Sequence, residues 1–240
     1  MRVAVLSDIH ANLPALDAVL AALGDVDAVW QLGDVVGYGP HPDEVVARLR
    51  EIGATGVRGN HDAAALGDLG AEWFNPAARR AVEWTARRIS PATRAWLADL
   101  PERAELGDMT LVHGSPRDPT WEYITTASDA RANLAALGTP YCLHGHTHVP
   151  AAWREDDRQV EALGLAHGSV LALDGRRVLL NPGSVGQPRD GDPRAGALVL
   201  DTETRRVTWH RVAYPITTTQ ADIRAAGLPA WLADRLVSGD

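Results

Sequence analysis

Side chains suited to metal binding recur along the sequence in five short blocks. The blocks are Asp8-Ile9-His10, Gly33-Asp34, Gly59-Asn60-His61-Asp62, His113-Gly114 and Gly145-His146-Thr147-His148. Imidazole nitrogen with carboxylate and amide oxygen suits divalent metals of borderline hardness, and not the soft ions that thiolates select. The sequence therefore indicates a metal site built from nitrogen and oxygen ligands.

Each block directly follows a run of residues with strand character. These runs are Val3 to Leu6, Ala28 to Leu32, Ala54 to Val57, Met109 to Val112 and Tyr141 to His144. In an open α/β sheet, ligands bind outside the carboxyl ends of the strands, so five loops should point at one crevice. A single block has simpler explanations, such as a helix cap, a turn or a structural histidine. Their recurrence at successive strand ends favours one shared site.

The rest of the pattern predicts an α/β fold. The N-terminal half alternates strands with amphipathic helices. The first is expected to have Pro14 in its first turn and to stop at Gly24, and the others cover Asp43 to Ile52, Pro76 to Ile89 and Pro91 to Leu100. After Pro101 strands dominate: Val149 to Trp153, Ser169 to Leu173, Arg177 to Leu180, Ala197 to Asp201 and Arg206 to Val212. Asp174-Gly175 and the segment from Asp201 to Thr204 have hairpin signals. A second sheet is therefore expected.

Composition sets the class of protein. The 240 residues are 45% hydrophobic and 22% charged, typical of a globular protein, and we expect a single domain over residues 1–240. The first apolar run is too short for a signal peptide, and no run approaches the roughly 18 residues of a membrane span. With the lone Cys142, this predicts a cytoplasmic protein. Short helices at about 218–237 are a possible cap over the site.

The charged residues exclude several kinds of chemistry. All 23 basic residues are arginine, which rules out P-loop and Schiff-base lysines. The net charge of −8 argues against broad nucleic-acid binding and gives no reason to expect a membrane partner. A phosphate must therefore be attracted by a local positive centre.

Two metal ions would supply that centre. The seven candidate ligands are too many for one tetrahedral zinc but fit two metals that share a carboxylate and a water. Two ions contribute +4 and the carboxylates of Asp8 and Asp34 contribute −2, so the loaded site is about +2 and attracts phosphate.

The five blocks, in this order from residue 8 to 148, resemble the calcineurin-like metallophosphoesterase superfamily. The segment from Asn181-Pro182-Gly183-Ser184 onward resembles a bacterial subgroup of predicted phosphodiesterases. The resemblance implies a four-layer αββα sandwich, with two mixed sheets flanked by helices. It assigns one metal to Asp8, His10, Asp34 and His148, and the other to Asp34, Asn60, His113 and His146. By the same resemblance His61 binds no metal and lies over the scissile phosphate, where Asp62 is a candidate for orienting it.

The expected activity is hydrolysis of P–O bonds by metal-bridging hydroxide, assisted by His61, with two divalent ions (Mn, Fe, Co, Ni or Zn) as cofactors. We expect a phosphodiesterase or nucleotide hydrolase acting on a small phosphate ester. Two alternatives are a phosphomonoesterase acting on a small molecule and a non-catalytic protein-binding scaffold of the same fold. The presence of His61 beside a complete ligand set argues against the scaffold.

One departure from the sequence pattern of related phosphoesterases concerns substrate binding. Protein Ser/Thr phosphatases and symmetrical dinucleoside tetraphosphatases carry Asp-Arg-Gly shortly after the Gly-Asp block, whereas this chain continues Val35-Val36-Gly37. Arg117 is our first candidate to replace that phosphate-binding arginine, although a surface salt bridge would explain it equally well, and Arg189 is a second candidate. His41 is a further candidate for substrate contact. The aromatic residues Trp73, Phe74, Trp121 and Tyr123 are placed either to stack a nucleobase or to pack in the core.

Overall fold

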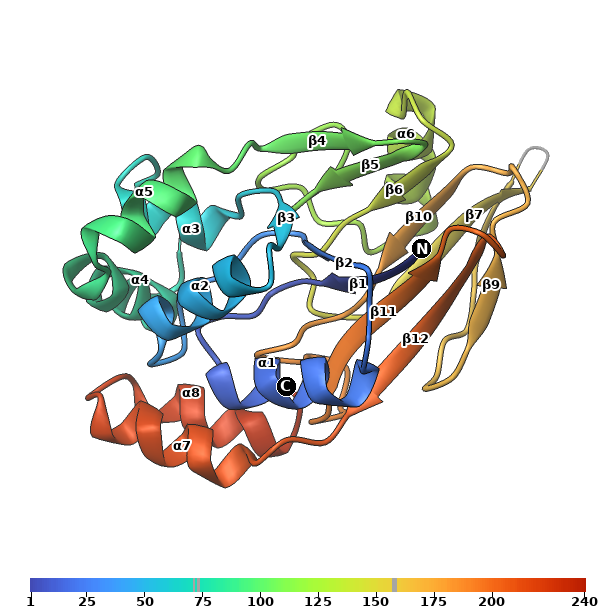
Figure 1. Ribbon diagram of the computed structural model, residues 1–240. Helices are drawn as coiled ribbons and strands as arrows, with labels where there is room; N and C mark the ends of the chain where they lie inside the picture. The colour runs from blue at the N-terminus through green and yellow to red at the C-terminus, as the bar shows by residue number, and fades with distance from the viewer. Residues whose placement is uncertain (71, 73, 157–158) are drawn as a thin grey trace.

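Two six-stranded mixed sheets form the centre of the computed structural model, which describes residues 1–70, 72, 74–156 and 159–240 (Figure 1). The first sheet has the order β3-β2-β1-β11-β12-β9. Its strands are β1 (Arg2–Leu6), β2 (Ala28–Gln31), β3 (Thr55–Gly56), β9 (Val170–Ala172), β11 (Ala195–Asp201) and β12 (Arg206–Val212). β1, β2 and β3 run parallel, and β11, β12 and β9 add antiparallel neighbours.

The second sheet has the order β4-β5-β6-β10-β7-β8. Its strands are β4 (Arg103–Leu106), β5 (Met109–Val112), β6 (Tyr141–Leu143), β7 (Ala151–Asp156), β8 (Gln159–Ala162) and β10 (Val178–Asn181). β5, β6 and β10 are parallel, while both edges of the sheet are antiparallel.

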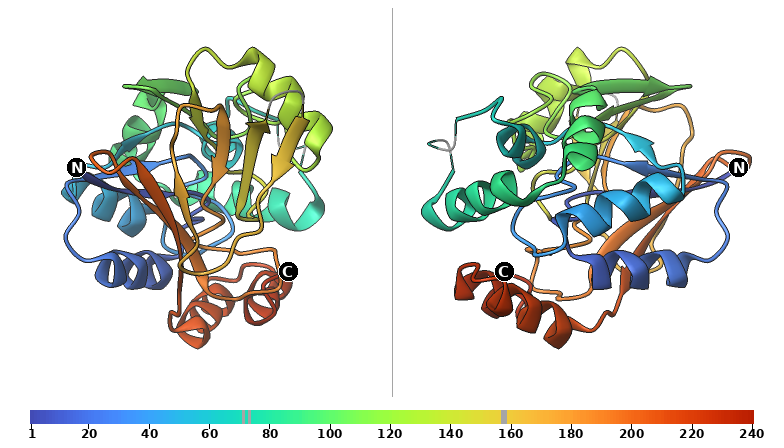
Figure 2. Two further views of the ribbon diagram at one scale, coloured as in Figure 1. Left: turned by 90° about the vertical axis from the view of Figure 1, so that its right-hand side faces the viewer. Right: turned by 60° about the vertical axis from the view of Figure 1, so that its left-hand side comes forward.

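Helices cover the outer faces of the two sheets, which gives the expected four-layer αββα sandwich (Figures 1 and 2). α1 (Leu13–Leu23) and α2 (Pro42–Glu51) pack on the first sheet, and α6 (Ala127–Ala136) packs on the second. Successive side chains of β1 alternate between the layers. Ala4 and Leu6 join the cluster under α1 and α2, whereas Val3 and Val5 meet the second sheet.

The other helices lie at the end of the sandwich where the parallel strands finish. α3 (Asn60–Leu66), α4 (Pro76–Arg88) and α5 (Pro91–Asp99) come from the middle of the chain, and α7 (Ile216–Ala225), α8 (Ala230–Asp234) and a 3₁₀ turn (Arg235–Val237) come from its end. Apolar residues of α4, α7 and α8 share one cluster, and the indole N–H of Trp84 donates to the Ala226 carbonyl at 3.0 Å. The C-terminal helices are thereby held beside α4 (Figure 2).

Several elements differ from the sequence expectation. β4, β8 and α6 were not predicted, because the edge strands read Arg-Ala-Glu-Leu and Gln-Val-Glu-Ala and the helix is rich in alanine and polar residues. The two strands alternate polar and apolar residues over only four positions, which is the lower limit for recognising a strand, and α6 has no clear apolar stripe at helical spacing. The hairpin predicted at Asp174-Gly175 is wrong, because β9 belongs to the first sheet and β10 to the second. The turn after Asp201 is confirmed, since β11 and β12 pair across it.

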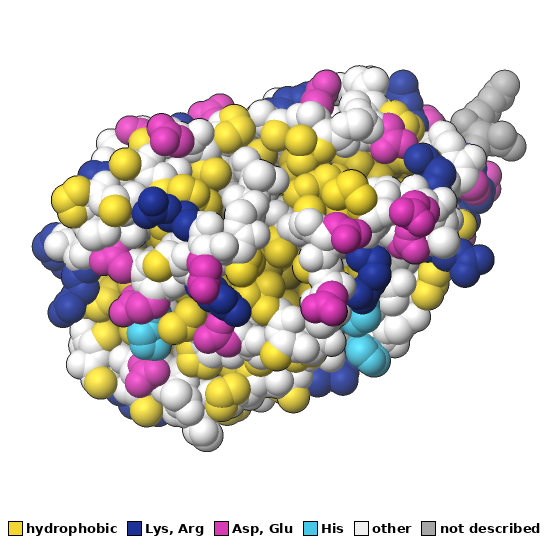
Figure 3. Space-filling model, in the orientation of Figure 1, with side chains coloured by type: hydrophobic (Ala, Val, Ile, Leu, Met, Phe, Trp, Pro, Cys, Tyr) yellow, Lys and Arg dark blue, Asp and Glu magenta, His cyan; other side chains and the backbone are white. Residues whose placement is uncertain are grey.

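The surface is mixed in charge. On the face in Figure 3, arginine side chains are interspersed with Asp and Glu and do not merge into a continuous basic patch. Within the described ranges, no helix is long and apolar enough to cross a membrane.

Candidate metal centre

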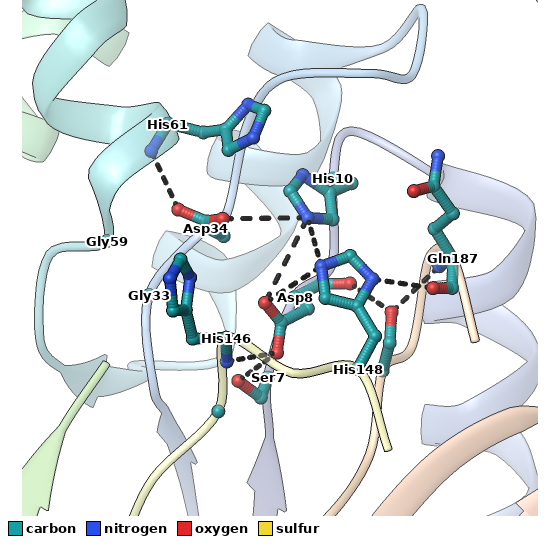
Figure 4. A network of polar contacts seen from close by, with 12 residues as sticks. Ser7, Asp8, His10, Gly33, Asp34, Gly59, His61, His146, His148 and Gln187 are labelled. Carbon is teal, nitrogen blue, oxygen red and sulfur yellow. Dashed lines mark hydrogen bonds and ion pairs between the residues drawn. The ribbon is translucent and has the colours of Figure 1, made fainter. Parts of the chain in front are cut away.

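The five strand-end loops bring all seven predicted ligands together, and Figure 4 labels Asp8, His10, Asp34, His146 and His148. Ligand atoms of Asp8, His10, Asp34 and His148 lie within 4.8 Å of one another, as do those of Asp34, His113 and His146. Asn60 joins the second group, because its Oδ1 lies 2.9 Å from His113 Nε2. All seven side chains are buried. The structure therefore forms two adjoining half-sites that share Asp34.

In the first half-site, acceptor atoms of His10, His148 and Asp8 converge with no donor between them among the described residues. The Nδ1 atoms of His10 and His148 lie 3.1 and 2.6 Å from the carbonyl oxygens of Val36 and Gln187, so each Nδ1 carries the ring proton. The Nε2 lone pairs of the two rings then face each other at 3.1 Å. Burial lowers the pKa of both rings well below the ordinary value. Neither ring therefore takes up a second proton that could form a hydrogen bond between the two Nε2 atoms.

Asp8 completes this first half-site. Its Oδ1 lies 3.3 Å from His148 Nε2 and has no hydrogen-bond partner among the described residues. Burial raises the pKa of Asp8 to about 6, despite opposition from His113. Buried acceptors that converge without a donor are stabilised by a cation placed among them. The donor set fits a divalent metal.

The second half-site holds a proton where a cation would bind. His113 Nδ1 lies 2.9 Å from the Leu32 carbonyl oxygen, and its Nε2 lies 3.0 Å from His146 Nδ1. Burial lowers the pKa of His113, but the charge and hydrogen bond of Asp34 outweigh it and raise the pKa to about 9. A divalent cation can replace this proton at Nε2.

Asp34 joins the half-sites through one oxygen. Its Oδ2 lies 3.6 Å from His10 Nε2 and 3.4 Å from His113 Nε2, while its Oδ1 accepts the backbone N–H of His61 at 2.8 Å. Burial raises its pKa, but His113, His61 and His10 together hold the pKa well below its usual value. Asp34 is thus a charged carboxylate shared by the two half-sites, one of which holds the His113 imidazolium.

The ligand loops have an unusual backbone. Asp8, His10, Asp34, His146 and His148 all have φ between 50° and 67°, in the left-handed region that non-glycine residues rarely adopt. Each such residue costs on the order of 1 to 2 kcal/mol, and such strain clusters at functional sites. The turns start directly at the strand ends and direct the side chains into the crevice.

Several supporting residues were missed by sequence reasoning. Ser7 Oγ and the backbone N–H of His146 donate to Asp8 Oδ2 at 2.7 and 3.1 Å. Asn181 Nδ2 donates to the Gly145 carbonyl at 2.8 Å, and Ser184 Oγ donates to the Asp8 carbonyl at 2.8 Å. Asn181 is the last residue of β10, so its motif lies at a strand end as the five blocks do, and this position was the available signal.

His61 lines the pocket without joining either ligand cluster. Its ring centroid lies 4.4 Å from Tyr38, 4.9 Å from Phe74 and 4.8 Å from His10. Burial lowers its pKa to about 4, partly offset by Asp34. Gly37, at φ 88°, leaves the room that the ring occupies, because a Cβ there would collide with His61 Nδ1.

Asp62 is buried and bonds to backbone. Its two oxygens accept the N–H groups of Val36 and Gly59, each at 3.0 Å. Burial and the charge of Asp34 raise its pKa to about 7. These contacts tie the start of α3 to the loop after β2, so any influence of Asp62 on His61 runs through the backbone.

The pocket above the ligands has a volume of about 140 Å³. It is lined by Asp34, Tyr38, Asn60, His61, Phe74, Asn75, Ala78, Trp121, Tyr123, His146, His148 and Arg189. Phe74, Trp121 and Tyr123 are therefore placed at the site, while Trp73 falls outside the described residues. A larger, open hollow lies between α1 and α2, away from the ligands.

Of the predicted substrate-binding residues, only Arg189 lines this pocket. Its Nη2 donates to Gln187 Oε1 at 3.0 Å and lies 3.3 Å from the Tyr38 hydroxyl. Arg117 is half-exposed and lies 3.6 Å from Glu122, which is the surface ion pair considered above. His41 Nε2 lies 3.5 Å from Asp222 on α7. Tyr38 was not predicted.

The C-terminal 3₁₀ turn contacts Gln187, the residue that also holds Arg189. Arg235 Nη1 donates to Gln187 Oε1 at 2.9 Å, so Gln187 accepts from two guanidinium groups. Burial lowers the pKa of Arg235 to about 10, and neighbouring Arg189 lowers it further. The end of the chain thus contacts the residue that positions Arg189.

Comparison with known proteins defines the class. Residues 1–205 match the model of the calcineurin-like phosphoesterase superfamily domain. A crystal structure of a metallophosphoesterase from Sphaerobacter thermophilus is 48% identical, with a TM-score of 0.92 over 100% of this chain and 99% of that chain. The chain belongs to the calcineurin-like phosphoesterase superfamily and is a metal-dependent phosphoric ester hydrolase.

Two curated relatives are also similar. The uncharacterized protein MJ0912 of Methanocaldococcus jannaschii is 34% identical over 99% of this chain and 98% of its own length. The phosphodiesterase YfcE of Escherichia coli is 29% identical over 86% of this chain and 91% of its own length. The family resemblance inferred from the five sequence blocks is thereby confirmed.

Proposed function

We propose that the protein is a phosphodiesterase or nucleotide hydrolase that uses two divalent metal ions. One observation carries the proposal: two buried clusters of acceptor atoms share Asp34 Oδ2, beneath a pocket that also presents His61 and Arg189. Mn, Fe, Co, Ni and Zn all suit this nitrogen and oxygen donor set.

Metal ions in these half-sites would supply Lewis acidity toward phosphate oxygens and would lower the pKa of water at the site to about 7. Asp8, His10, Asp34 and His148 would hold one ion, and Asp34, Asn60, His113 and His146 the other. The left-handed backbone at five of these residues fixes their side chains before substrate arrives.

Arg189 and His61 act on the substrate in this proposal. The guanidinium of Arg189 is held at the pocket by Gln187 and Tyr38, which leaves donors directed at phosphate oxygens. The His61 ring is held between Tyr38 and Phe74, where it can stabilise charge on phosphate or donate a proton to the leaving oxygen.

A curated relative favours a diester as substrate, and the size of the pocket favours a small one. The relative YfcE is named a phosphodiesterase, and a pocket of about 140 Å³ suits a phosphate group with little else. The interspersed charges in Figure 3 give no track for a long nucleic-acid backbone on that face. The partner is therefore a small phosphate ester.

The test is a hydrolysis assay on metal-stripped protein reconstituted with each of the five metals. We expect turnover of bis(p-nitrophenyl) phosphate that requires metal and exceeds turnover of p-nitrophenyl phosphate in kcat/KM. A higher kcat/KM for the monoester would identify a phosphomonoesterase instead. Absence of hydrolysis in every metal state would indicate a non-catalytic scaffold and contradict the proposal.

A further inference from the structure

An apolar groove of about 470 Å³ lies beside the metal pocket. Its walls come from the loop before α6, the loop that carries His146 and His148, and strands β7 and β8. Among the described residues that line it, none carries a charge. Its size falls within the usual range of small-molecule sites, which is about 300 to 1,000 Å³.

The groove and the metal pocket are separated by a single segment of chain. His146 and His148 face the metal pocket, whereas the intervening Thr147 and the following Val149 line the groove. Tyr123 lines both cavities. A ligand with its phosphate over the metal ligands can therefore extend past Tyr123 into the groove.

Tyr123 offers a flat surface at this junction. Its ring stacks on the His146 imidazole, with centroids 3.9 Å apart and planes at 23°. The residue is still 49% exposed, so a large part of it remains open to solvent. An exposed aromatic face held by stacking is suited to a second planar ring.

The rest of the groove suits an uncharged group. Ile124 and Ala152 form buried parts of its wall, and Val149 is a large apolar residue exposed there. Trp153 also lines the groove, and its buried indole N–H has no hydrogen-bond partner among the described residues. Burying a charged arm against this wall would be costly, whereas an aromatic arm gains apolar contact.

We propose that this groove binds an uncharged planar arm, of the size of an aryl ring or nucleobase, of the phosphate ester whose phosphate lies at the metal site. This inference rests on the proposed function and specifies its substrate class. Tyr123 stacks the arm where it leaves the phosphate, and the β7–β8 side of the groove covers its far end.

The test compares 2-naphthylphosphonate with methylphosphonate as ligands of the metal-loaded protein, by calorimetry, because neither compound has a P–O ester bond to cleave. We expect the naphthyl compound to bind at least about tenfold more tightly, since stacking of one ring on an aromatic side chain is commonly worth that much. Tyr123→Leu should remove most of this preference.

A matched pair of charge substitutions locates the arm. Ala162 is exposed on β8 and lines the groove, whereas Ala166 is exposed and lies outside it. Ala162→Glu should abolish the naphthyl preference, and Ala166→Glu should keep it. In protein labelled with 5-fluorotryptophan, the ¹⁹F resonance of Trp153 should shift with 2-naphthylphosphonate and not with methylphosphonate.

Three results would overturn the inference. Equal affinities for the two ligands, or equal effects of the two glutamate substitutions, would show that no arm enters the groove. A change in molar mass for Ala162→Glu, without a change in ligand affinity, would identify the groove as a contact between two copies of the chain. If neither phosphonate bound the metal-loaded protein, the proposed function would fail, and this inference would fail with it.

Discussion

Replacement of His61 by glutamine separates metal binding from turnover. The backbone N–H of His61, and not its ring, donates to Asp34, so the bridging carboxylate keeps this contact in His61→Gln. The ring contacts with Tyr38 and Phe74 are lost, at a cost of about 1 kcal/mol each, which a domain with about 5 to 15 kcal/mol of stability tolerates. The variant should therefore fold and retain its metals.

Its turnover should still fall. Loss of a positioned proton donor or charge stabiliser typically lowers kcat by about 10² to 10⁴, equivalent to about 3 to 5 kcal/mol in the barrier. If the ring protonates the leaving oxygen, the loss should be smaller for an aryl diester than for an alkyl diester. If it stabilises charge on phosphate, the loss should be uniform.

The assay is kcat for both diesters together with metal content by elemental analysis. His41→Gln is the matched control, because that ring faces Asp222 and lies outside the pocket, so its rates should stay within about twofold. Loss of metal from His61→Gln, or wild-type rates with both diesters, would refute the assigned role.

Two further outcomes follow from the site. Arg189→Lys should raise KM for phosphate esters by about tenfold, because the bidentate guanidinium is lost. Arg117→Lys should leave the steady-state kinetics unchanged, because Arg117 lies in a surface ion pair. The reverse ranking would identify Arg117 as the phosphate-binding arginine. Metal affinity should rise with pH, because a cation must displace the proton of His113, whose pKa in the metal-free site is about 9, and of Asp8, whose pKa is about 6. The logarithm of the affinity should climb by about one per pH unit between these values and by about two below pH 6, and a flat calorimetric profile from pH 6 to 8 would contradict this displacement.

The convergence of the seven candidate ligands was predictable from the sequence because strand ends are strongly marked. Each of the five blocks follows a short run of β-branched or apolar residues, and parallel strands bring their carboxyl ends to one edge. The layered fold follows from the same pattern together with the family resemblance. Both rest on local signals that tertiary packing did not override.

Other parts of the molecule depend on three-dimensional context. Arg117 and Arg189 look alike in sequence, and only Glu122 and Gln187 show which guanidinium is in a surface pair and which is held at the pocket. Tyr38 lies in the glycine-containing loop after β2, where no sequence pattern indicated that its ring contacts His61. The β9 and β10 segments flank a good turn motif, yet their pairing partners are long-range and place them in different sheets.

The number and position of the metal ions test the central claim most directly. Anomalous diffraction from crystals of Mn-reconstituted protein should show two ions per chain, about 3.5 to 4 Å apart, on either side of Asp34 Oδ2. Asp34→Asn should lower the occupancy of both ions, because both share its charge, whereas Asp8→Asn should lower only that of the ion beside His10 and His148. One ion or none in the wild-type protein, or full occupancy of both sites in Asp34→Asn, would contradict a dinuclear centre bridged by this carboxylate.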